Sequence, residues 1–284
     1  MSVPARFAQR TAPAAALLGI VLAHAALAQG LLSKGGDEPV TIHADDGIEW
    51  VRDAKKYVAR GNASATRNDA TIRADTLTAY YREKTEGKGQ DIFRVDAVGD
   101  VRISSNEQQA TGDKGVYHVD KAVFVLVGKN LRFQSTQGVL TARDSLEYWE
   151  ERGLAVARGN AIVTQENQRM RADIMTAHIA EETVSTAGTA DSGPLKLPQG
   201  SSRIKQVDAF GNVHISMQKA IVRGDTGVYV PARGVATICG NVRITSGTNQ
   251  LNGKCAEVNL KTGIYRLTGR AKGLVAPSTK PKRR

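Results

Sequence analysis

A short phrase that recurs along this chain at fixed spacing is the strongest constraint on its fold. Gly followed by Asn or Asp stands fourteen residues before an Asp in four places: Gly61 and Asp75, Gly99 and Asp113, Gly159 and Asp173, Gly211 and Asp225. Fifteen residues further on Gly returns, as from Asp113 to Gly128 and from Asp225 to Gly240. The two steps make a repeat of about 29 residues, a period typical of chains that stack one supersecondary unit upon the next.

Insertions of loop-like composition lengthen some of these steps. Residues 83–90 are charged and glycine-rich, and residues 185–202 consist mainly of Ser, Thr, Gly and Pro. We expect 185–202 to be a mobile loop and the basic tail 277–284 to be disordered. Because the repeats otherwise run without a break, we expect a single repeat domain over residues 40–270.

Within each repeat the apolar residues alternate with polar ones. Val101 and Ile103 flank Arg102, and the same pattern follows Gly211 and Gly240. Alternation over four to eight residues, rich in Val, Ile and Thr, is typical of a strand with one buried face. The sequence therefore predicts an all-β fold, an elongated roll or taco of stacked antiparallel strands.

The residues predicted to face inward include many small ones. They are Ala63, Ala65, Ala79, Gly115, Ala161, Ala177, Gly227 and Ala256. Beside Val, Ile and Tyr, such residues could leave a lengthwise groove for an elongated apolar ligand. The two sheets could equally close together over small side chains, and the sequence leaves these alternatives open.

The first residues have the features of an export signal. Arg6 and Arg10 precede an apolar run, and residues 26–28 form a small-x-small cleavage site. We predict a cleaved signal peptide at residues 1–28, with an uncleaved membrane anchor as the alternative. Removing both arginines lowers the formal charge from +11 to +9. The remaining positive charge is typical of a protein with an anionic partner, and the alternative is that it only keeps the protein soluble.

The two cysteines, Cys239 and Cys255, are predicted to form a disulfide. If a hairpin turns at residues 246–248, residues whose numbers add up to 494 face each other, and these two satisfy that condition. An exported protein meets an oxidising compartment, so a bond is expected, with two buried thiols as the alternative.

The sequence contains no recognisable catalytic or metal-binding motif. The four histidines of the repeats lie in separate units, and the repeated Asp residues beside Gly are expected to accept hydrogen bonds at corners. We expect no enzyme activity, no metal, no cofactor and no nucleic-acid partner.

Five phrases of the chain resemble a known repeat. They are GDVRI (99–103), GDKGVY (112–117), GNVHI (211–215), GDTGVY (224–229) and GNVRI (240–244). With the export signal, they make residues 40–270 resemble the OstA-like family of periplasmic lipopolysaccharide-transport proteins to which LptA belongs. The resemblance implies a β-jellyroll whose interior binds the acyl chains of lipid A. It also implies head-to-tail assembly into a bridge from an inner-membrane anchor protein to an outer-membrane translocon.

This resemblance turns the inward residues into a candidate lipid-binding groove. Its predicted members are Val101, Ile103, Tyr117, Leu146, Val213, Ile215, Tyr229, Val242 and Ile244. Arg102, Arg132, Arg243 and Arg266 are expected near its mouth, where they could meet lipid phosphates. Unpaired strand edges at about residues 40–60 and 255–270 would allow head-to-tail pairing.

Three other interpretations remain open at this point. The chain could be another OstA-like component of the same pathway, departing from the bridge protein in length, inserted loop and tail. It could be a secreted β-solenoid that acts on acidic polysaccharide, although its acids are spread evenly. It could also be a structural or adhesive repeat protein with a closed interior.

Overall fold

The structure is a computed structural model that describes residues 40–67, 70–83, 89–105, 108–136, 138–179, 204–260 and 262–275. The predicted signal peptide (1–28), loop (185–202) and tail (277–284) lie outside the described residues. Strands form most of the described chain, and its helical segments are two 3₁₀ turns, Val119–Lys121 (η1) and Glu150–Arg152 (η2). In these ranges no helix has the length and apolar character to span a bilayer.

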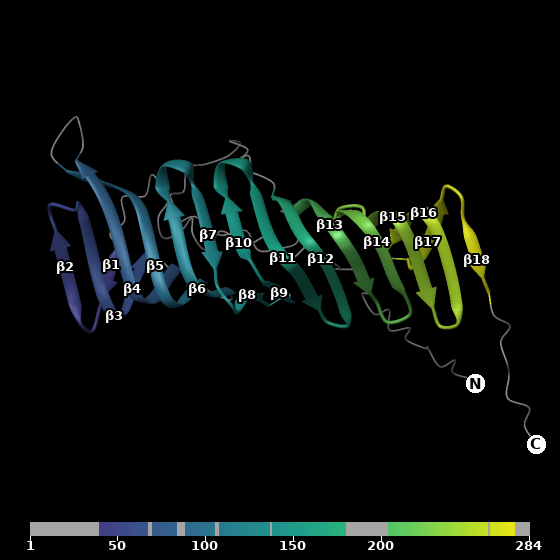
Figure 1. Cartoon of the computed structure of the whole chain (residues 1–284), viewed down its shortest axis with the longest axis horizontal. Coiled ribbons are helices and arrows are strands. Elements are labelled where there is room, and N and C mark those ends of the chain that lie inside the picture. Colours follow the sequence, from purple (N-terminus) through teal and green to yellow (C-terminus); the bar gives the residue numbers. More distant parts are fainter. Residues whose placement is uncertain are drawn as a thin grey trace, which may run out of the picture.

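The strands follow one another as antiparallel neighbours along a single elongated sheet (Figure 1). Their bounds are β1 Thr41–His43, β2 Gly47–Val51, β3 Lys56–Arg67, β4 Ala70–Glu83, β5 Gln90–Ser105, β6 Gln108–His118, β7 Val123–Val127, β8 Leu131–Ser135, β9 Gly138–Ala142, β10 Ser145–Trp149, β11 Leu154–Gln165, β12 Gln168–Ile179, β13 Ile204–Ser216, β14 Ile221–Val230, β15 Val235–Ser246, β16 Asn249–Asn259, β17 Ile264–Thr268 and β18 Lys272–Leu274.

The sheet is folded lengthwise into two arms that face each other. Arm A contains β1, β8, β9 and β18, arm B contains β2, β7, β10 and β17, and every other strand runs through both arms. We call each crossing of the two arms a rung, so that β1 with β2 forms the first rung and β17 with β18 the last. The predicted all-β fold, an elongated OstA-like β-jellyroll of stacked antiparallel strands, is confirmed.

Each rung bends at a corner where the chain passes from one arm to the other. At five corners two consecutive residues have positive φ, for example 73° at Gly61 and 44° at Asn62. The strand register shifts at the same point, between Arg60 and Ala63. A Cβ on Gly61 would lie 2.5 Å from Oδ2 of Asp46, which belongs to the adjacent rung. The corner therefore requires Gly, followed by a residue that tolerates the left-handed conformation.

The same contact explains the fifteen-residue step of the sequence. Six corner glycines pack against an Asp of the rung before them, in the pairs Gly61–Asp46, Gly99–Asp75, Gly128–Asp113, Gly159–Asp144, Gly211–Asp173 and Gly240–Asp225. At the last corner Gly269 packs against Lys254 instead. Asn212 and Asn241 donate through Nδ2 to Asp173 and Asp225 at 2.8 Å. The backbone N–H of Lys129 donates to Asp113 Oδ2 at 2.9 Å. These corner aspartates therefore accept hydrogen bonds, as expected, though mainly from Asn side chains.

The core lies between the arms and is built from inward rows of directly opposed residues. One row of arm A runs from Met170 through Ile215 and Val222 to Ile244, each facing the next across a strand pair. Along arm B, large and small residues alternate in blocks, as in the series Tyr117, Phe124, Tyr148, Ala155, Ala177, Val207, Tyr229 and Ala236. This arrangement gives one continuous hydrophobic cluster along the roll.

Candidate functional site

The nine residues predicted to line the interior all lie on its inward rows. Eight of them are at most 3% exposed: Val101, Ile103, Tyr117, Val213, Ile215, Tyr229, Val242 and Ile244. All of these except Tyr117 belong to the continuous cluster. Leu146 is half-buried and packs against that cluster. Their orientation is as expected from the alternation, and their contact with a lipid stays a prediction.

The two arms meet over the interior. A Cβ added to Gly227 in arm B would lie 3.5 Å from Cγ1 of Val213 in arm A. A Cβ added to Gly115 would lie 3.6 Å from Cγ1 of Val101 in the same way. Small residues on one arm thus accommodate larger side chains of the other beside the corners. Farther from the corners Ile215, Tyr229 and Ile244 are also at most 3% exposed, which corresponds to the closed one of the two packing alternatives. An elongated guest could enter only where the arms separate or at the ends of the roll.

The first rung exposes interior side chains to solvent. Ile48 and Trp50 face inward opposite Ala59 and Tyr57, yet they are 53% and 46% exposed because no rung of the described chain covers them. Among the strands that the structure describes, β1 and β2 pair with β3 alone, and β17 and β18 pair with β16 alone. Within the described chain each end therefore presents an unpaired strand edge (Figure 1). Exposed apolar side chains, Ile48 and Trp50 on β2 and Ile264 on β17, lie on these end strands.

Tyrosines line arm B close to its outer ends. Tyr117 donates through its hydroxyl to Glu150 at 3.4 Å, so this hydroxyl points toward the turn at the end of the arm. Tyr81 accepts a hydrogen bond from Trp50 Nε1 at 2.8 Å. Burial raises the pKa of Tyr229 to about 12, and burial followed by Glu150 raises that of Tyr117. An apolar ring with a polar tip suits a boundary between hydrocarbon and water.

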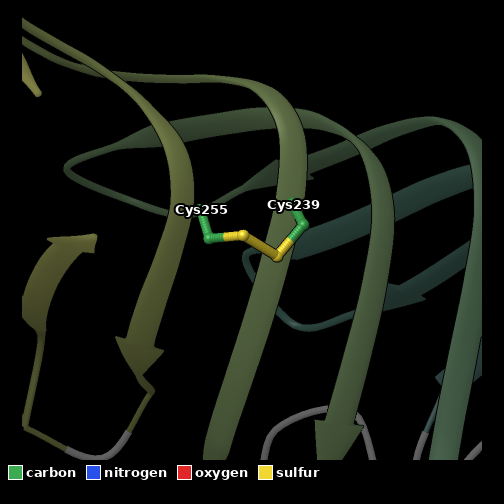
Figure 2. The surroundings of a disulfide bond; sticks show 2 residues. All are labelled: Cys239 and Cys255. Carbon is green, nitrogen blue, oxygen red and sulfur yellow. A yellow bond between two sulfur atoms is a disulfide. The ribbon is translucent and has the colours of Figure 1, made fainter. Parts of the chain in front are cut away.

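Cys239 and Cys255 form the predicted disulfide (Figure 2). They face each other directly across β15 and β16. The hairpin turns on two residues, Gly247 and Thr248, rather than three, and the corner at residues 240–241 shifts the register by one. These two differences cancel at the cysteines, which is why the simple hairpin register still predicted the pair.

Arm A carries a row of basic side chains on its outer face, which we call the basic row. Its arginines are Arg73, Arg102, Arg132, Arg171, Arg223 and Arg243, and all six are exposed. Arg73 directly faces Arg102, and Arg223 directly faces Arg243. Like charges opposed across a strand pair destabilise a sheet, so this arrangement weakens the fold unless a partner compensates it.

The basic row also contains His214 and Lys272. His214 lies between Arg171 and Arg223, and its pKa is lowered by burial and then by Arg223, Arg171 and Arg169. Arg102, Arg132 and Arg243, which were expected near the mouth of the interior, lie instead on this outer row. Arg266 lies opposite Glu257 on arm B and does not join them.

The outer face of arm B carries acidic as well as basic side chains. Four of its acidic residues have a basic neighbour, in the contacts Arg60–Glu49, Arg94–Asp96, Arg158–Glu147 and His178–Asp208. Burial opposes ionisation of Glu147, but hydrogen bonds from Arg158, Ser145 and Trp149 outweigh it and lower its pKa.

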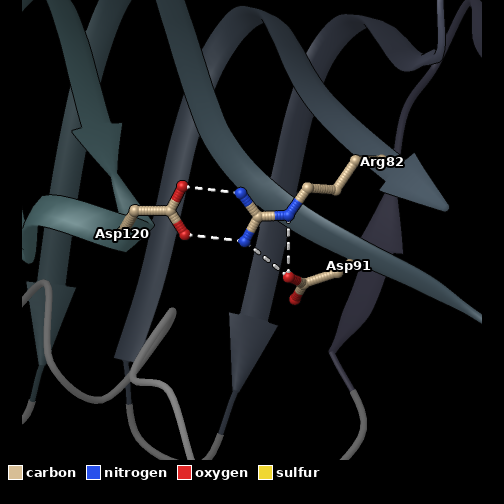
Figure 3. A network of polar contacts seen from close by, with 3 residues as sticks. All are labelled: Arg82, Asp91 and Asp120. Carbon is tan, nitrogen blue, oxygen red and sulfur yellow. Dashed lines mark hydrogen bonds and ion pairs between the residues drawn. The ribbon is translucent and has the colours of Figure 1, made fainter. Parts of the chain in front are cut away.

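At the end of arm B, Arg82 bridges Asp91 and Asp120 (Figure 3). These carboxylates raise the pKa of its guanidinium. On arm A, by contrast, Arg102 is the one arginine of the basic row with a carboxylate partner, Asp100 at 2.8 Å, among the residues that the structure describes.

Potential metal ligands are dispersed over the described ranges. No group of three or more His, Cys, Asp or Glu residues there is arranged to hold a metal ion. The corner aspartates, which could have suggested stacked calcium sites, lie one per corner beside Gly.

Comparison with known proteins identifies related chains. The family described as "LptA/(LptD N-terminal domain) LPS transport protein" matches twice, at residues 41–144 and 141–264. An uncharacterized protein of Rhizobium meliloti (strain 1021) is 31% identical over 144 residues, which is 46% of this chain and 76% of that protein. The crystal structure of LptH, the LptA homologous periplasmic component of the lipopolysaccharide transport device from Pseudomonas aeruginosa, is 11% identical. That match covers 85% of this chain and 97% of LptH, with a TM-score of 0.21.

The two adjoining matches reveal a larger repeat that the short period concealed. Residues 58–63 and residues 156–161 have the same sequence, VARGNA, and RAD at 73–75 returns at 171–173. Both offsets are 98 residues, so the first rung corresponds to the rung of β9 and β10. At this offset Asp46, Ile48 and Trp50 correspond to Asp144, Leu146 and Tyr148. This identity is visible in the sequence, and a search at offsets longer than one rung pair would have found it.

Proposed function

The chain belongs to the LptA/(LptD N-terminal domain) family of lipopolysaccharide transport proteins, and on this premise we propose that it holds the acyl chains of lipid A between arms A and B. Family members are transport components, so the chain acts in lipopolysaccharide transport and not as an enzyme. We propose further that it works in the periplasm and joins an inner-membrane anchor protein to an outer-membrane translocon through head-to-tail copies.

The observation that carries this proposal is the uninterrupted apolar cluster between the arms. It runs along the stack of rungs, a length of roughly 60 Å at about 4.8 Å per strand. Each methylene of an acyl chain left in water costs about 0.8 kcal/mol relative to a buried one. A continuous apolar path removes that cost along the whole route, and no covalent step is needed.

Because the interior is closed, binding requires the arms to move apart. Acyl chains would replace contacts between arm A and arm B with contacts to lipid, which keeps the buried apolar surface out of water. The tyrosine hydroxyls near the ends of arm B would then face the polar part of the lipid. The corners, pinned by the Gly–Asp contacts, would serve as the fixed edge of the opening.

Photo-crosslinking tests whether lipid enters the interior. The probe belongs at Leu146, which faces inward and is only half-buried, because a bulky group at Ile215 or Val242 would overpack the core. Val228, exposed on the outer face of arm B, is the matched control. We expect labelled lipopolysaccharide to be captured at Leu146 and not at Val228. Equal capture at both positions, or capture at neither, would contradict the proposed interior site.

The internal repeat supplies a specific register for the contact between copies. Inside the chain, Phe124 and Leu126 of β7 face Tyr148 and Leu146 of β10. At the chain's end Tyr265 and Leu267 stand four and two residues before Gly269, as Phe124 and Leu126 do before Gly128. Since Trp50 and Ile48 match Tyr148 and Leu146, we expect Tyr265 to face Trp50 and Leu267 to face Ile48 of the next copy.

Engineered cysteines test this register. Leu267→Cys combined with Ile48→Cys should give disulfide-linked multimers under oxidation, because directly opposed residues lie within bonding distance. Arg266→Cys combined with Ile48→Cys shifts the pairing by one residue and should link poorly. If the two pairs link equally well, the copies do not associate in the register of the internal junction.

A further inference from the structure

The basic row is the strongest surface feature that an apolar interior leaves unexplained. It extends from Arg73 on β4 to Lys272 on β18, about 50 Å along the roll at roughly 4.8 Å per strand. Arg171, Arg223 and Arg243 have no carboxylate partner among the residues that the structure describes. Arg102 pairs with Asp100, but several positive charges of the row have no such neighbour in the described ranges, and these charges favour a partner with several negative charges.

The two outer faces differ in whether their charged side chains form ion pairs within the chain. On arm B, ion pairs of 2.6 Å between Arg94 and Asp96 and 2.7 Å between Arg158 and Glu147 neutralise these two carboxylates. Those acids are therefore occupied, and a second copy of this chain could not use them freely to cover the basic row. The face of arm A remains positive, which favours a different anionic molecule as its partner.

The row next to the basic row adds hydrogen-bonding groups of a particular kind. Thr71, Ser104, Gln109 and Gln134 follow one another across adjacent strands on the same face. Hydroxyls and amides suit sugar hydroxyls, and guanidinium groups suit phosphate and carboxylate oxygens. Neither outer row of arm A contains a Phe, Tyr or Trp in the described chain, so the stacking platform of a single-stranded nucleic-acid site is missing there.

We propose that the outer face of arm A binds the phosphorylated, acidic oligosaccharide of lipopolysaccharide. The proposal rests on the proposed function, because it assigns the polar half of the molecule whose acyl chains lie between the arms. Arg102 stands three residues from the end of β5 at Ser105, about 10 Å of extended chain. The polar part of the lipid would leave the interior between the ends of the two arms, on the side opposite the corners. If the saccharide then folds over the end of arm A, it reaches the basic row within that distance.

The test uses the full mature chain and fully deacylated lipopolysaccharide, which keeps its phosphates and lacks acyl chains. The triple variant Arg171→Gln, Arg223→Gln, Arg243→Gln removes three exposed charges from the basic row. The matched control, Lys114→Gln, Lys205→Gln, Arg266→Gln, removes three exposed charges from arm B. The basic-row variant should be at least as stable as the parent, because it relieves the repulsion between Arg223 and Arg243.

Calorimetric titration should show binding to the parent that weakens with added salt. Three exposed charge contacts, each worth roughly a two- to three-fold change, predict about a ten-fold weaker affinity for the basic-row variant. The control should change by less than about two-fold, and a dephosphorylated ligand should bind the parent as weakly as the phosphorylated ligand binds the basic-row variant.

Three results would overturn the proposal: no binding of the deacylated ligand by the parent, equal losses in both variants, or no effect of dephosphorylation. Capture at Leu146 is read separately. If lipopolysaccharide is not captured at Leu146 but calorimetry still shows binding, the interior site is wrong and an outer site for phosphorylated saccharides remains. If lipopolysaccharide is captured at Leu146 but calorimetry shows no binding of the deacylated ligand, the proposed site on the basic row is wrong and the interior site remains.

Discussion

The Gly–Asp contact at the corners makes a quantitative prediction for Gly211→Ala. Gly211 has a φ of 73°, and a Cβ placed there would lie 2.9 Å from Cγ of Asp173 and 3.0 Å from its Cβ. Two costs therefore add: left-handed backbone strain and a collision with the neighbouring rung. Gly247 isolates the first cost, because its φ is 57° and no atom lies within 4 Å of a Cβ there.

The expected magnitudes follow from these two environments. Left-handed strain in an Ala costs roughly 1–2 kcal/mol, and the lower entropy of the unfolded chain offsets about 0.4–1 kcal/mol of it. Overpacking adds about 1–3 kcal/mol. We expect Gly211→Ala to lower the free energy of unfolding by about 3 kcal/mol and Gly247→Ala by about 1 kcal/mol.

Urea denaturation of the four members of a double-mutant cycle provides the assay. In an Asp173→Ala background the carboxyl group is gone, so Gly211→Ala should cost roughly 1–2 kcal/mol less than it does in the parent. Asp173→Ala alone loses the hydrogen bond from Asn212 at 2.8 Å and should cost about 1 kcal/mol. Equal costs for Gly211→Ala and Gly247→Ala, or no coupling to Asp173, would refute the argument that the neighbouring Asp selects Gly at the corners.

Three further predictions concern the core, the disulfide and the basic row. Ile215→Asp should lower the free energy of unfolding by roughly 3–5 kcal/mol, since Ile215 is 2% exposed and an unpaired charge would be buried. Thermal melting would measure this loss, and the control Ile215→Val should cost little. Replacing Cys239 and Cys255 by Ala should cost about 3 kcal/mol in urea, because a loop of about 15 residues is no longer closed in the unfolded chain; the parent under reductant should behave alike. His214 has a lowered pKa in the fold, so its stability contribution is fully present above the unfolded value of 6.5 and is lost as pH falls through the folded pKa. Stability measured from pH 7.5 to pH 5 should therefore decline less in His214→Gln than in the parent, and parallel curves would contradict this reasoning.

The repeat spacing and the alternation were sufficient to predict the strands and their inward faces. Val213 and Ile215 follow Gly211 at the second and fourth positions, and both prove buried, because side chains alternate strictly between the faces of a strand. Leu146 follows Asp144 in the same way and is only half-buried. Alternation sets the direction of a side chain, whereas its burial depends on how large the opposing residues are.

The charged residues were harder to assign from the sequence. Arg102, Arg132, Arg243 and Arg266 look alike in their strands, yet three share one outer row and the fourth lies on the other arm. The corner decides this, because the strand that enters it on arm A leaves it on arm B. Asp96 and Glu147 likewise could not be recognised as neutralised, since their partners Arg94 and Arg158 are identified only by side-chain geometry.

By itself the sequence determined the antiparallel roll, its corners and the pairing of Cys239 with Cys255, because these depend on spacing along one chain and on conformations that few residues tolerate. The tertiary structure alone decided that the interior is closed and that one outer face keeps its positive charge. Both properties arise from atoms far apart in sequence: packing depends on the sum of side-chain volumes across two arms, and net charge on which ion pairs can form between rungs.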